Sequence, residues 1–342
     1  MSMAYEKPTH SLNQIDRAGK AILEPFDAAA GIQVLNSWRV AHRYPLNALH
    51  MTLRNRSIRI DGNAVTAQRL KRLESVVRKL YRQPTLQMSQ MQDIGGCRAV
   101  LSTMNRVNML RFMYETNPLR HKLARTRDYI SNPKEDGYRS VHLIYRFVGK
   151  ATSSPWNKLW IEIQLRTSLQ HAWATAVETV DAFTSENLKF GSGSDDWKRF
   201  FQLIGALHAR TEKTAPIPNV PTAYDALARE AKLLERKLGV IHRLEQYAHI
   251  TQQITRKKRG VNFDWYVMQI LPDSGRVIVR GFPLQAFDQA QESLILLEAK
   301  FKGTRNQAVL VATASLNELR RAYPNYFADT KFFIEVLRSL VR

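Results

Sequence analysis

The side chains best suited to chemistry gather in the polar stretch from Asp128 to His142. It carries two cations (Lys134 and Arg139), the imidazole of His142 and the aromatic ring of Tyr138, and it is punctuated by proline and glycine. An aromatic ring can stack on a base, and guanidinium and ammonium groups pair with phosphates. The stretch therefore indicates a nucleotide-binding loop, although a turn entering a strand would have the same punctuation.

Two carboxylates lie beside strand-like runs that flank this stretch. Asp93 precedes two glycines and the run 97–101, which places it at a strand entrance where backbone can approach a ligand closely. An Asx turn that opens a strand is the alternative. Glu162 lies within the strand-like run 160–167. The two carboxylates could share one Mg²⁺, which takes one or two carboxylates plus phosphate oxygens.

Strand alternation places Glu162 on a common face with two more polar groups. Glu162, Gln164 and Arg166 project to one side, and the apolar residues between them project to the other. A carboxylate, an amide and a guanidinium in a row on an otherwise apolar strand favour a functional face over a solvent face.

A further group of polar residues is spaced as if it lay along one face of a helix. The apolar residues from Val65 to about Leu80 predict an amphipathic helix. Lys71, Ser75 and Lys79 follow at i, i+4 steps and would form one stripe on it. Two ammonium groups and a hydroxyl suit a row of phosphates, but a solvated helix face has the same composition.

Other nucleotide and thiol chemistries lack sequence support. Neither the Gly-x-x-x-x-Gly-Lys-[Ser/Thr] loop nor the glycine-rich loop of protein kinases occurs. The single cysteine, Cys97, cannot form an internal disulfide, and no histidine lies beside it in the sequence. We expect it to be a small buried side chain.

Alternation of strand-like and helical runs predicts the scaffold behind these groups. It is an α/β fold with a mixed β-sheet flanked by helices, a helical N-terminal region and a small C-terminal α+β module. The expected helices cover much of 1–60 and the runs 107–115, 168–183, 224–255, 284–301 and 316–323. The expected strands are 97–101, 141–148, 159–165, 265–271, 276–282 and 308–312, with breaks at 191–194 and 216–221.

Charge is the outlier in the composition. The chain has 51 Lys+Arg against 30 Asp+Glu, a net charge of +21, which attracts nucleotides and RNA alike. Its apolar runs are shorter than the roughly 18 residues that cross a bilayer, and its N-terminus lacks a secretory pattern. These features predict a soluble cytoplasmic protein with a phosphate-bearing partner and no membrane association.

Taken in order, the clusters resemble the synthetase domain of the RelA/SpoT alarmone synthetases, a family that includes toxic small alarmone synthetases. The resemblance covers roughly residues 60–180 and implies a nucleotidyltransferase-like domain over 61–185. A helical region (1–60), a helical connector (186–260) and a C-terminal module (261–342) complete the expected organisation. The matching residues are Arg69-x-Lys71-x-x-x-Ser75-x-x-x-Lys79, Asp93-x-x-Gly96-x-Arg98, Asp128-Tyr-Ile…Pro133-Lys134…Gly137-Tyr-Arg-Ser-x-His142 and Glu162-Ile-Gln-Leu-Arg166-Thr167.

The resemblance implies transfer of pyrophosphate from ATP to a ribose 3′-hydroxyl, with Mg²⁺ as cofactor. Asp93 and Glu162 would be the catalytic, metal-binding carboxylates, and Glu162 would also draw the proton from the 3′-hydroxyl. Arginines suit the two faces of adenine. The ATP-binding residues would be Arg69 and Arg98 at adenine and Lys71, Ser75 and Lys79 at the phosphates.

The acceptor side follows from the loop and the last strand. Tyr138 would stack on the base that receives the pyrophosphate. The remaining acceptor-binding residues would be Lys134, Arg139, His142, Gln164 and Arg166.

Two departures from the family stand out. The His-Asp motif of the hydrolase domain is absent, so no alarmone hydrolysis is expected. The Glu-His pair that often follows the last motif is also incomplete, because Glu178 is followed by threonine. We interpret this as a difference in packing or oligomeric state, and a homo-oligomer stays open.

Three functions remain in consideration. The leading one is a GTP pyrophosphokinase-type enzyme that makes (p)ppGpp from ATP and GDP or GTP. The second is toxin-type pyrophosphorylation of the tRNA 3′ end, with the C-terminal module as a regulatory or neutralising element; the basic run 256–259 suits an RNA acceptor. The third is an inactive nucleotide- or RNA-binding protein, against which the retention of both Asp93 and Glu162 argues.

Overall fold

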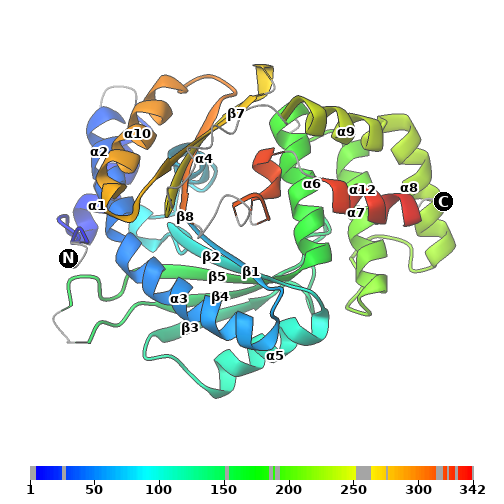
Figure 1. Cartoon of the computed structure of the whole chain (residues 1–342), viewed down its shortest axis with the longest axis horizontal. Coiled ribbons are helices and arrows are strands. Elements are labelled where there is room, and N and C mark those ends of the chain that lie inside the picture. Colours follow the sequence, from blue (N-terminus) through cyan, green and yellow to red (C-terminus); the bar gives the residue numbers. More distant parts are fainter. Residues whose placement is uncertain are drawn as a thin grey trace.

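A computed structural model describes the chain at residues 5–24, 28–150, 154–184, 188, 193–251, 263–274, 276–312, 319–321, 323–327 and 330–340. Four of the predicted segments lie wholly or partly outside these residues: the break at 191–194, the end of the helix at 224–255, the basic run at 256–259 and the helix at 316–323. Figure 1 shows a central sheet with helices on both faces and a further helical group at one end.

One eight-stranded sheet runs through the protein (Figure 1) in the order β3-β4-β5-β2-β1-β8-β6-β7. β2 and β5 pair in parallel, and the other neighbours pair antiparallel, which confirms the predicted mixed sheet. The strands are β1 (Val65–Leu70), β2 (Gly95–Leu101), β3 (Lys122–Asp128), β4 (Val141–Arg146), β5 (Trp160–Thr167), β6 (Trp265–Leu271), β7 (Arg276–Phe282) and β8 (Gln307–Ala312).

Helices cover both faces of this sheet. α3 and α5 pack on one face of the β1, β2 and β5 region, α6 packs on the opposite face, and α10 covers β6 and β8. α7, α8, α9 and α12 form a helical group beside α6 (Figure 1). The helices are α1 (Leu12–Ala21), α2 (Ala28–Ala41), α3 (Arg43–Ile60), α4 (Leu73–Arg82), α5 (Met104–Thr116), α6 (Ser168–Thr184), α7 (Asp195–Thr211), α8 (Tyr224–Leu238), α9 (Val240–Thr251), α10 (Phe287–Lys300) and α12 (Lys331–Leu340).

The helix predicted over 65–80 is wrong in its first half. Residues 65–70 form β1, and α4 begins only at Leu73. β1 is hydrogen-bonded on one edge to β2 and on the other to β8, and this tertiary pairing outweighs the local helical spacing. Lys71 therefore lies between the strand and the helix, and only Ser75 and Lys79 share a helical face.

The single helix predicted over 224–255 is also wrong. α8 ends at Gly239, whose backbone φ of +60° is left-handed, and its N–H donates to the carbonyl of Glu235 at 2.8 Å. α9 then starts at Val240. Glycine adopts this conformation without a steric penalty, which is why it commonly terminates helices.

Strand β3 was not predicted. Its residues are mostly charged or polar, and it is the edge strand beside β4. One row of its backbone groups is unpaired within the sheet, and such edges are commonly protected by charged side chains. The strand therefore lacks the apolar alternation on which sequence-based assignment depends.

The C-terminal strands belong to the same sheet as the predicted nucleotide domain. β8 pairs with β1 through Gln68↔Ala312 and Arg69↔Val311, and β6 pairs with β8. The predicted strands at 265–271, 276–282 and 308–312 are confirmed. Tyr323 packs with Val311 on the face of the sheet opposite α10.

No helix among the described residues is both long and apolar enough to cross a bilayer.

Candidate active site

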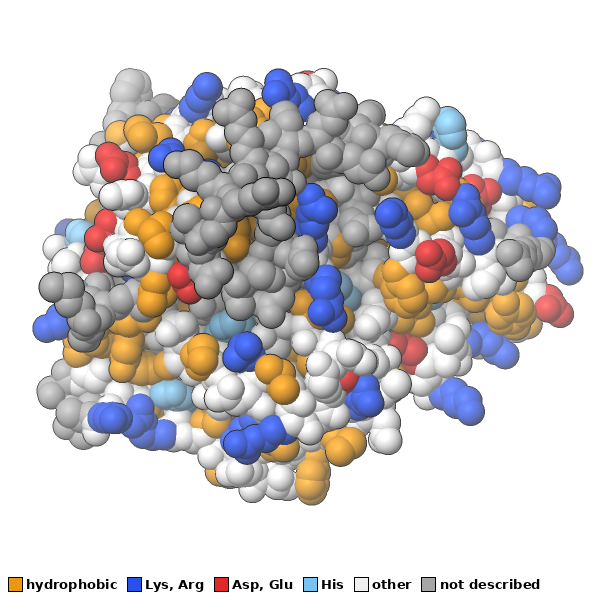
Figure 2. Space-filling model, in the orientation of Figure 1, with side chains coloured by type: hydrophobic (Ala, Val, Ile, Leu, Met, Phe, Trp, Pro, Cys, Tyr) orange, Lys and Arg blue, Asp and Glu red, His pale blue; other side chains and the backbone are white. Residues whose placement is uncertain are grey.

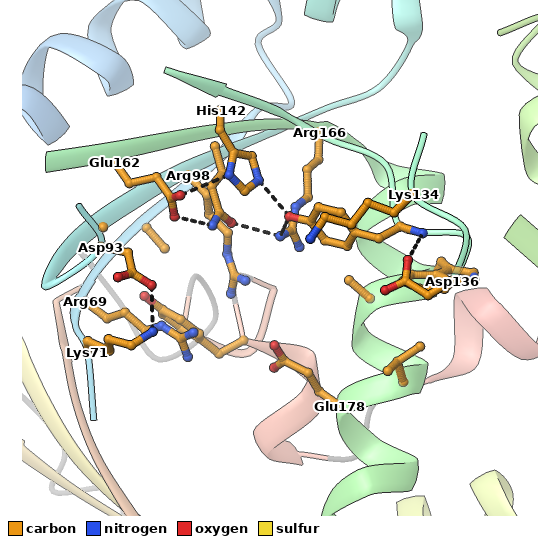
Figure 3. A pocket seen from close by; sticks show the side chains of 18 of the residues that line it. Arg69, Lys71, Asp93, Arg98, Lys134, Asp136, His142, Glu162, Arg166 and Glu178 are labelled. Atoms are coloured by element: carbon orange, nitrogen blue, oxygen red, sulfur yellow. Dashed lines mark hydrogen bonds and ion pairs between the residues drawn. The ribbon is translucent and has the colours of Figure 1, made fainter. Parts of the chain in front are cut away.

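A cavity of about 340 Å³ lies between the sheet and α6. β1, β2 and β5 supply one wall, and α6, the loop before β4, α7 and the segment around Tyr323 supply the others (Figure 3). The alternation predicted for β5 is confirmed: Glu162, Gln164 and Arg166 face this cavity, while the intervening residues enter the core beneath α3 and α5.

A carboxylate held by two lysines marks one end of the cavity. Asp93, two residues before β2, accepts from Lys71 Nζ at 2.6 Å and from Lys79 Nζ at 2.9 Å. Burial alone would raise the pKa of Asp93, but the charges and hydrogen bonds of the two lysines outweigh it, so the pKa lies well below its ordinary value. Asp93 is therefore ionised at neutral pH, and two cations are available beside it for anionic oxygens.

A closed ring of hydrogen bonds occupies the β4–β5 side. Arg166 Nη2 donates to Tyr138 Oη at 2.6 Å and to Gln164 Oε1 at 2.8 Å, and Gln164 Nε2 donates to Glu162 Oε2 at 2.6 Å. His142 joins the remaining ends, with Nε2 2.8 Å from Tyr138 Oη and Nδ1 2.9 Å from Glu162 Oε1. If the Tyr138 hydroxyl donates to Nε2, then His142 donates from Nδ1 to Glu162, which satisfies the whole ring.

The ring sets the protonation of its members. Burial alone would raise the pKa of Glu162, and the nearby Asp93 adds to this, but His142 and Gln164 outweigh both and lower it. Burial raises the pKa of Tyr138. Glu162 is thus an ionised carboxylate that can accept a proton, and Tyr138 is a neutral phenol.

The loop before β4 presents Tyr138 between cations. The Cζ atom of Arg166 lies 5.2 Å from the Tyr138 ring centroid, and Lys134 Nζ lies 5.1 Å from it. Gly137 reaches a φ of +93°, and a Cβ there would meet the Phe201 carbonyl oxygen at 2.9 Å. Helix α7 therefore packs directly on the loop and fixes the position of the tyrosine ring.

Three predicted site residues do not line the cavity, and one of them, Lys79, reaches it only through its ion pair with Asp93. Arg139, only 3% exposed, donates to Glu212 at 2.8 Å and to Thr214 at 3.1 Å instead. It is one residue out of phase with Tyr138, so extended backbone directs it elsewhere. Ser75 is half-buried on α4 and is not among the lining residues.

The two predicted adenine-binding arginines do lie together. Arg69 of β1 and Arg98 of β2 both line the cavity, and they stand at neighbouring positions of the antiparallel pair, where Arg98 faces Ala67. The Cζ atom of Arg98 is 4.5 Å from the ring centroid of Tyr323, which is 2% exposed. Burial lowers the pKa of Arg98 to about 10, so it remains a cation at neutral pH. Tyr323 thus stacks on Arg98 where adenine was expected to bind.

Some lining residues were missed at the sequence level. Glu178 and Trp173 line the cavity from α6, Asp136 from the loop and Lys198 from α7 (Figure 3 labels Glu178 and Asp136). The helical spacing of Trp173 and Glu178 could have suggested a shared face, but nothing in the sequence connects Lys198 to the motifs.

The expectation that Cys97 is a small buried side chain is confirmed. It is 3% exposed in the core beneath α3, and burial raises its pKa strongly. Only its small surface touches the cavity. Thiol chemistry is therefore not available here at neutral pH.

Comparison with known proteins finds similarity over the part of the chain that carries most of the cavity's lining residues. Residues 68–182 match the family model described as "Region found in RelA / SpoT proteins". This segment is similar to that region and supplies most of the residues that line the cavity. GTP pyrophosphokinase YwaC of Bacillus subtilis is 34% identical over 116 residues, which cover 32% of this chain and 54% of that protein. GTP pyrophosphokinase YjbM of the same organism is 30% identical over 122 residues, which cover 35% and 57%. The chain therefore spans little more than half the length of these relatives.

Solved structures are also similar to the chain. Small alarmone synthetase 1 from Bacillus subtilis has a TM-score of 0.41 and 24% identity, covering 50% of this chain and 88% of that one. Small alarmone synthetase 2 from Bacillus subtilis has a TM-score of 0.42 and 22% identity, covering 51% and 92%.

Proposed function

We propose that the protein transfers pyrophosphate from ATP to the 3′-hydroxyl of GDP or GTP, making (p)ppGpp. The observation that carries this proposal is one cavity, lined mostly by the segment that is similar to RelA / SpoT proteins, with a lysine-held carboxylate at one end and a tyrosine beside a carboxylate at the other. Two named GTP pyrophosphokinases among the relatives support the same reaction class.

The donor half would be the Asp93 end. Lys71 and Lys79 would move from Asp93 to the phosphates of ATP, because phosphate oxygens and carboxylates compete for the same ammonium groups. Arg69 and Arg98 would take the adenine between them. Positioning plus charge stabilisation accounts for most of the catalysis of phosphoryl transfer.

The acceptor half would be the ring around Glu162. Tyr138 would stack on the guanine, and Lys134 and Arg166 would neutralise its phosphates. The 3′-oxygen would attack the β-phosphorus of ATP, its proton would pass to Glu162, and the bond to the α-phosphate oxygen would break to release AMP. The lowered pKa keeps Glu162 ready to accept that proton at neutral pH.

Mg²⁺ fits the donor set of this cavity. Among the described residues, no group of three or more His, Cys, Asp and Glu side chains could hold a metal by itself. The charge of Asp93 acts to raise the pKa of Glu162, which places the two carboxylates in one electrostatic environment, and Mg²⁺ needs only one or two carboxylates when substrate phosphates complete its shell. The ion would neutralise charge on the transferring phosphates.

The test uses the full chain with labelled ATP, Mg²⁺ and either GDP or GTP. We expect a 3′-pyrophosphorylated nucleotide and AMP in equal amounts, and loss of both in Asp93→Ala and Glu162→Gln. Asp225→Asn on the exposed start of α8 is the matched control and should be fully active. Nucleotide binding without transfer would instead indicate the inactive binding protein.

A second candidate function has its own supporting observation: pyrophosphorylation of the tRNA 3′ end, restrained by the C-terminal module. Tyr323 comes from that module and stacks on Arg98 in the proposed adenine site. The +21 charge suits RNA, and Figure 2 shows basic side chains spread over the displayed face.

Tyr323→Ala in the full chain separates the two candidates. This substitution leaves β8 paired with β1. A chain truncated before residue 261 would lack β8, so one edge of β1 would lose its hydrogen-bonded strand. The second candidate predicts that this variant labels the tRNA 3′ end from ATP and arrests growth on expression, and that the native chain does neither. If Tyr323→Ala labels tRNA no faster than the native chain does, and the native chain transfers pyrophosphate efficiently to GDP, the first candidate is retained and the second is rejected.

A further inference from the structure

A carboxylate of the C-terminal module reaches the beginning of α4. Glu298 on α10 accepts from the backbone N–H of Leu73, the first residue of α4, at 3.0 Å through Oε1. The preceding residue, Arg72, makes no side-chain hydrogen bond that caps the helix. The first N–H groups of a helix need such an acceptor, and a negative charge at this end also favours the helix dipole.

A buried ion pair holds this carboxylate in place. Arg39 on α2 donates to Glu298 Oε2 at 2.8 Å and to Oε1 at 3.1 Å, and its Nη1 also donates to Asn36 at 2.9 Å. The side chains of Arg39 and Glu298 are only 1% and 8% exposed. A two-bond arginine–carboxylate pair shielded from water is geometrically restrictive, so Glu298 is an anchored acceptor.

What Glu298 anchors is the phosphate end of the cavity. Lys71 lies two residues before the capped N–H and Lys79 six residues after it, and both bind Asp93. Figure 1 shows α10 beside α2, and Glu298 joins these two helices to the first residue of α4. Because α4 is short, a shift of its first turn would move both ammonium groups relative to Asp93.

We propose that Glu298 is a positioning residue for the donor phosphates, so that the C-terminal module completes the ATP half of the site. Glu298 lies 116 residues beyond the end of the matched RelA/SpoT region at residue 182. The proposal rests on the proposed pyrophosphate transfer. It gives the module a supporting role that is separate from the contact between Tyr323 and Arg98.

Two double variants isolate the cap from the ion pair. Arg39→Met with Glu298→Gln removes both charges but keeps an oxygen that can accept from Leu73. Arg39→Met with Glu298→Met removes the charges and the acceptor together, with similar side-chain volume. Each double variant is made in the full chain and also in the full chain carrying Tyr323→Ala. The second background removes the Tyr323 ring from the proposed adenine site, so that this ring does not mask differences in ATP binding.

The measurements are KM for ATP, KM for the acceptor, kcat and urea unfolding. We expect the Met–Met pair to raise KM for ATP by about fivefold relative to the Met–Gln pair, the factor that corresponds to the typical cost of losing one helix cap. KM for the acceptor should be equal in the two pairs. A purely structural role would lower stability without this split between substrates.

The outcomes are distinct. Equal KM for ATP in the two pairs overturns the positioning role, even where both transfer normally. A parallel rise in both KM values also overturns it, because the effect would then not be specific to the donor half. Failure of the native chain and of Tyr323→Ala to transfer pyrophosphate to any acceptor overturns the proposed function instead, and fluorescent-ATP binding to the same variants still decides the role of Glu298.

Discussion

Replacing Glu212 with glutamine should loosen the acceptor loop while leaving the donor half intact. Glu212 follows α7 and is the ion-pair partner of Arg139, the residue next to Tyr138. Its carboxylate also accepts from Gln170 at 2.9 Å and from the Thr167 hydroxyl. One buried carboxylate therefore joins the loop, the end of β5 and α7.

The expected magnitude follows from burial. The Arg139 and Glu212 side chains are 2% and 8% exposed, so the charge left on Arg139 cannot be solvated by water. Breaking a buried pair costs about 3–5 kcal/mol, and because glutamine retains one acceptor oxygen we expect about 3 kcal/mol of lost unfolding free energy. The matched control is Glu230→Gln. Its partner is Arg199, and the two side chains are 31% and 36% exposed, so it should lose about 0.5 kcal/mol.

Urea unfolding and steady-state kinetics test this together. For Glu212→Gln we expect a higher KM for GDP or GTP at unchanged KM for ATP, because Tyr138 is displaced while Lys71 and Lys79 are not. Glu230→Gln should match the native chain in both. The reasoning is refuted if the two variants lose the same free energy, or if Glu212→Gln changes KM for ATP as much as KM for the acceptor.

Three more outcomes follow from the site. Tyr138→Phe keeps the ring but removes the hydroxyl between Arg166 and His142, so kcat should fall by the equivalent of about 1–3 kcal/mol at nearly constant acceptor KM; a large KM increase in steady-state assays would contradict this. The pKa of Asp93 is lower in the folded chain than its ordinary value of 3.8, so the ionised carboxylate stabilises the fold fully at neutral pH. This contribution to the unfolding free energy is lost as the pH falls below 3.8. Asp93→Asn should therefore show a shallower loss of unfolding free energy between about pH 5 and pH 2 in acid titrations. Cys97 should resist a thiol reagent at pH 8 and react fully in urea, and rapid native labelling would show that its core position is wrong.

The sequence was informative wherever a local pattern determines the direction of a side chain. Alternation along β5 correctly placed Glu162 and its two polar neighbours on one face, opposite the apolar core. The same rule, applied strictly, would have separated Arg139 from Tyr138, since adjacent residues of extended backbone point apart. The prediction that both residues bind the acceptor did not take this alternation into account. Arg139 instead forms a buried ion pair with Glu212.

Local patterns could not reveal features that depend on long-range pairing. Helical spacing over 65–80 is real, but β1 forms because two other strands supply its hydrogen bonds. Lys71 and Lys79 still reach a common carboxylate, although they do not share a helix. Glu298 and Tyr323 are more than 100 residues from the motifs, and neither carries a recognisable signature. Their roles depend on which elements become neighbours in the folded chain.

The pairing of β8 with β1 explains why the C-terminal module can both support and occupy the donor half. β1 carries Arg69, so the pairing of β8 with its other edge brings residues of the C-terminal module to the proposed ATP end of the cavity. The helix before β8 lies on one face and delivers Glu298 to the start of α4, whereas Leu319 and Tyr323 lie on the other face, where Tyr323 contacts Arg98. The two contacts are thus on opposite sides of one strand, and removing the second does not require losing the first. A regulator that released Tyr323 while β8 stayed paired would open the adenine site and keep the phosphate site assembled.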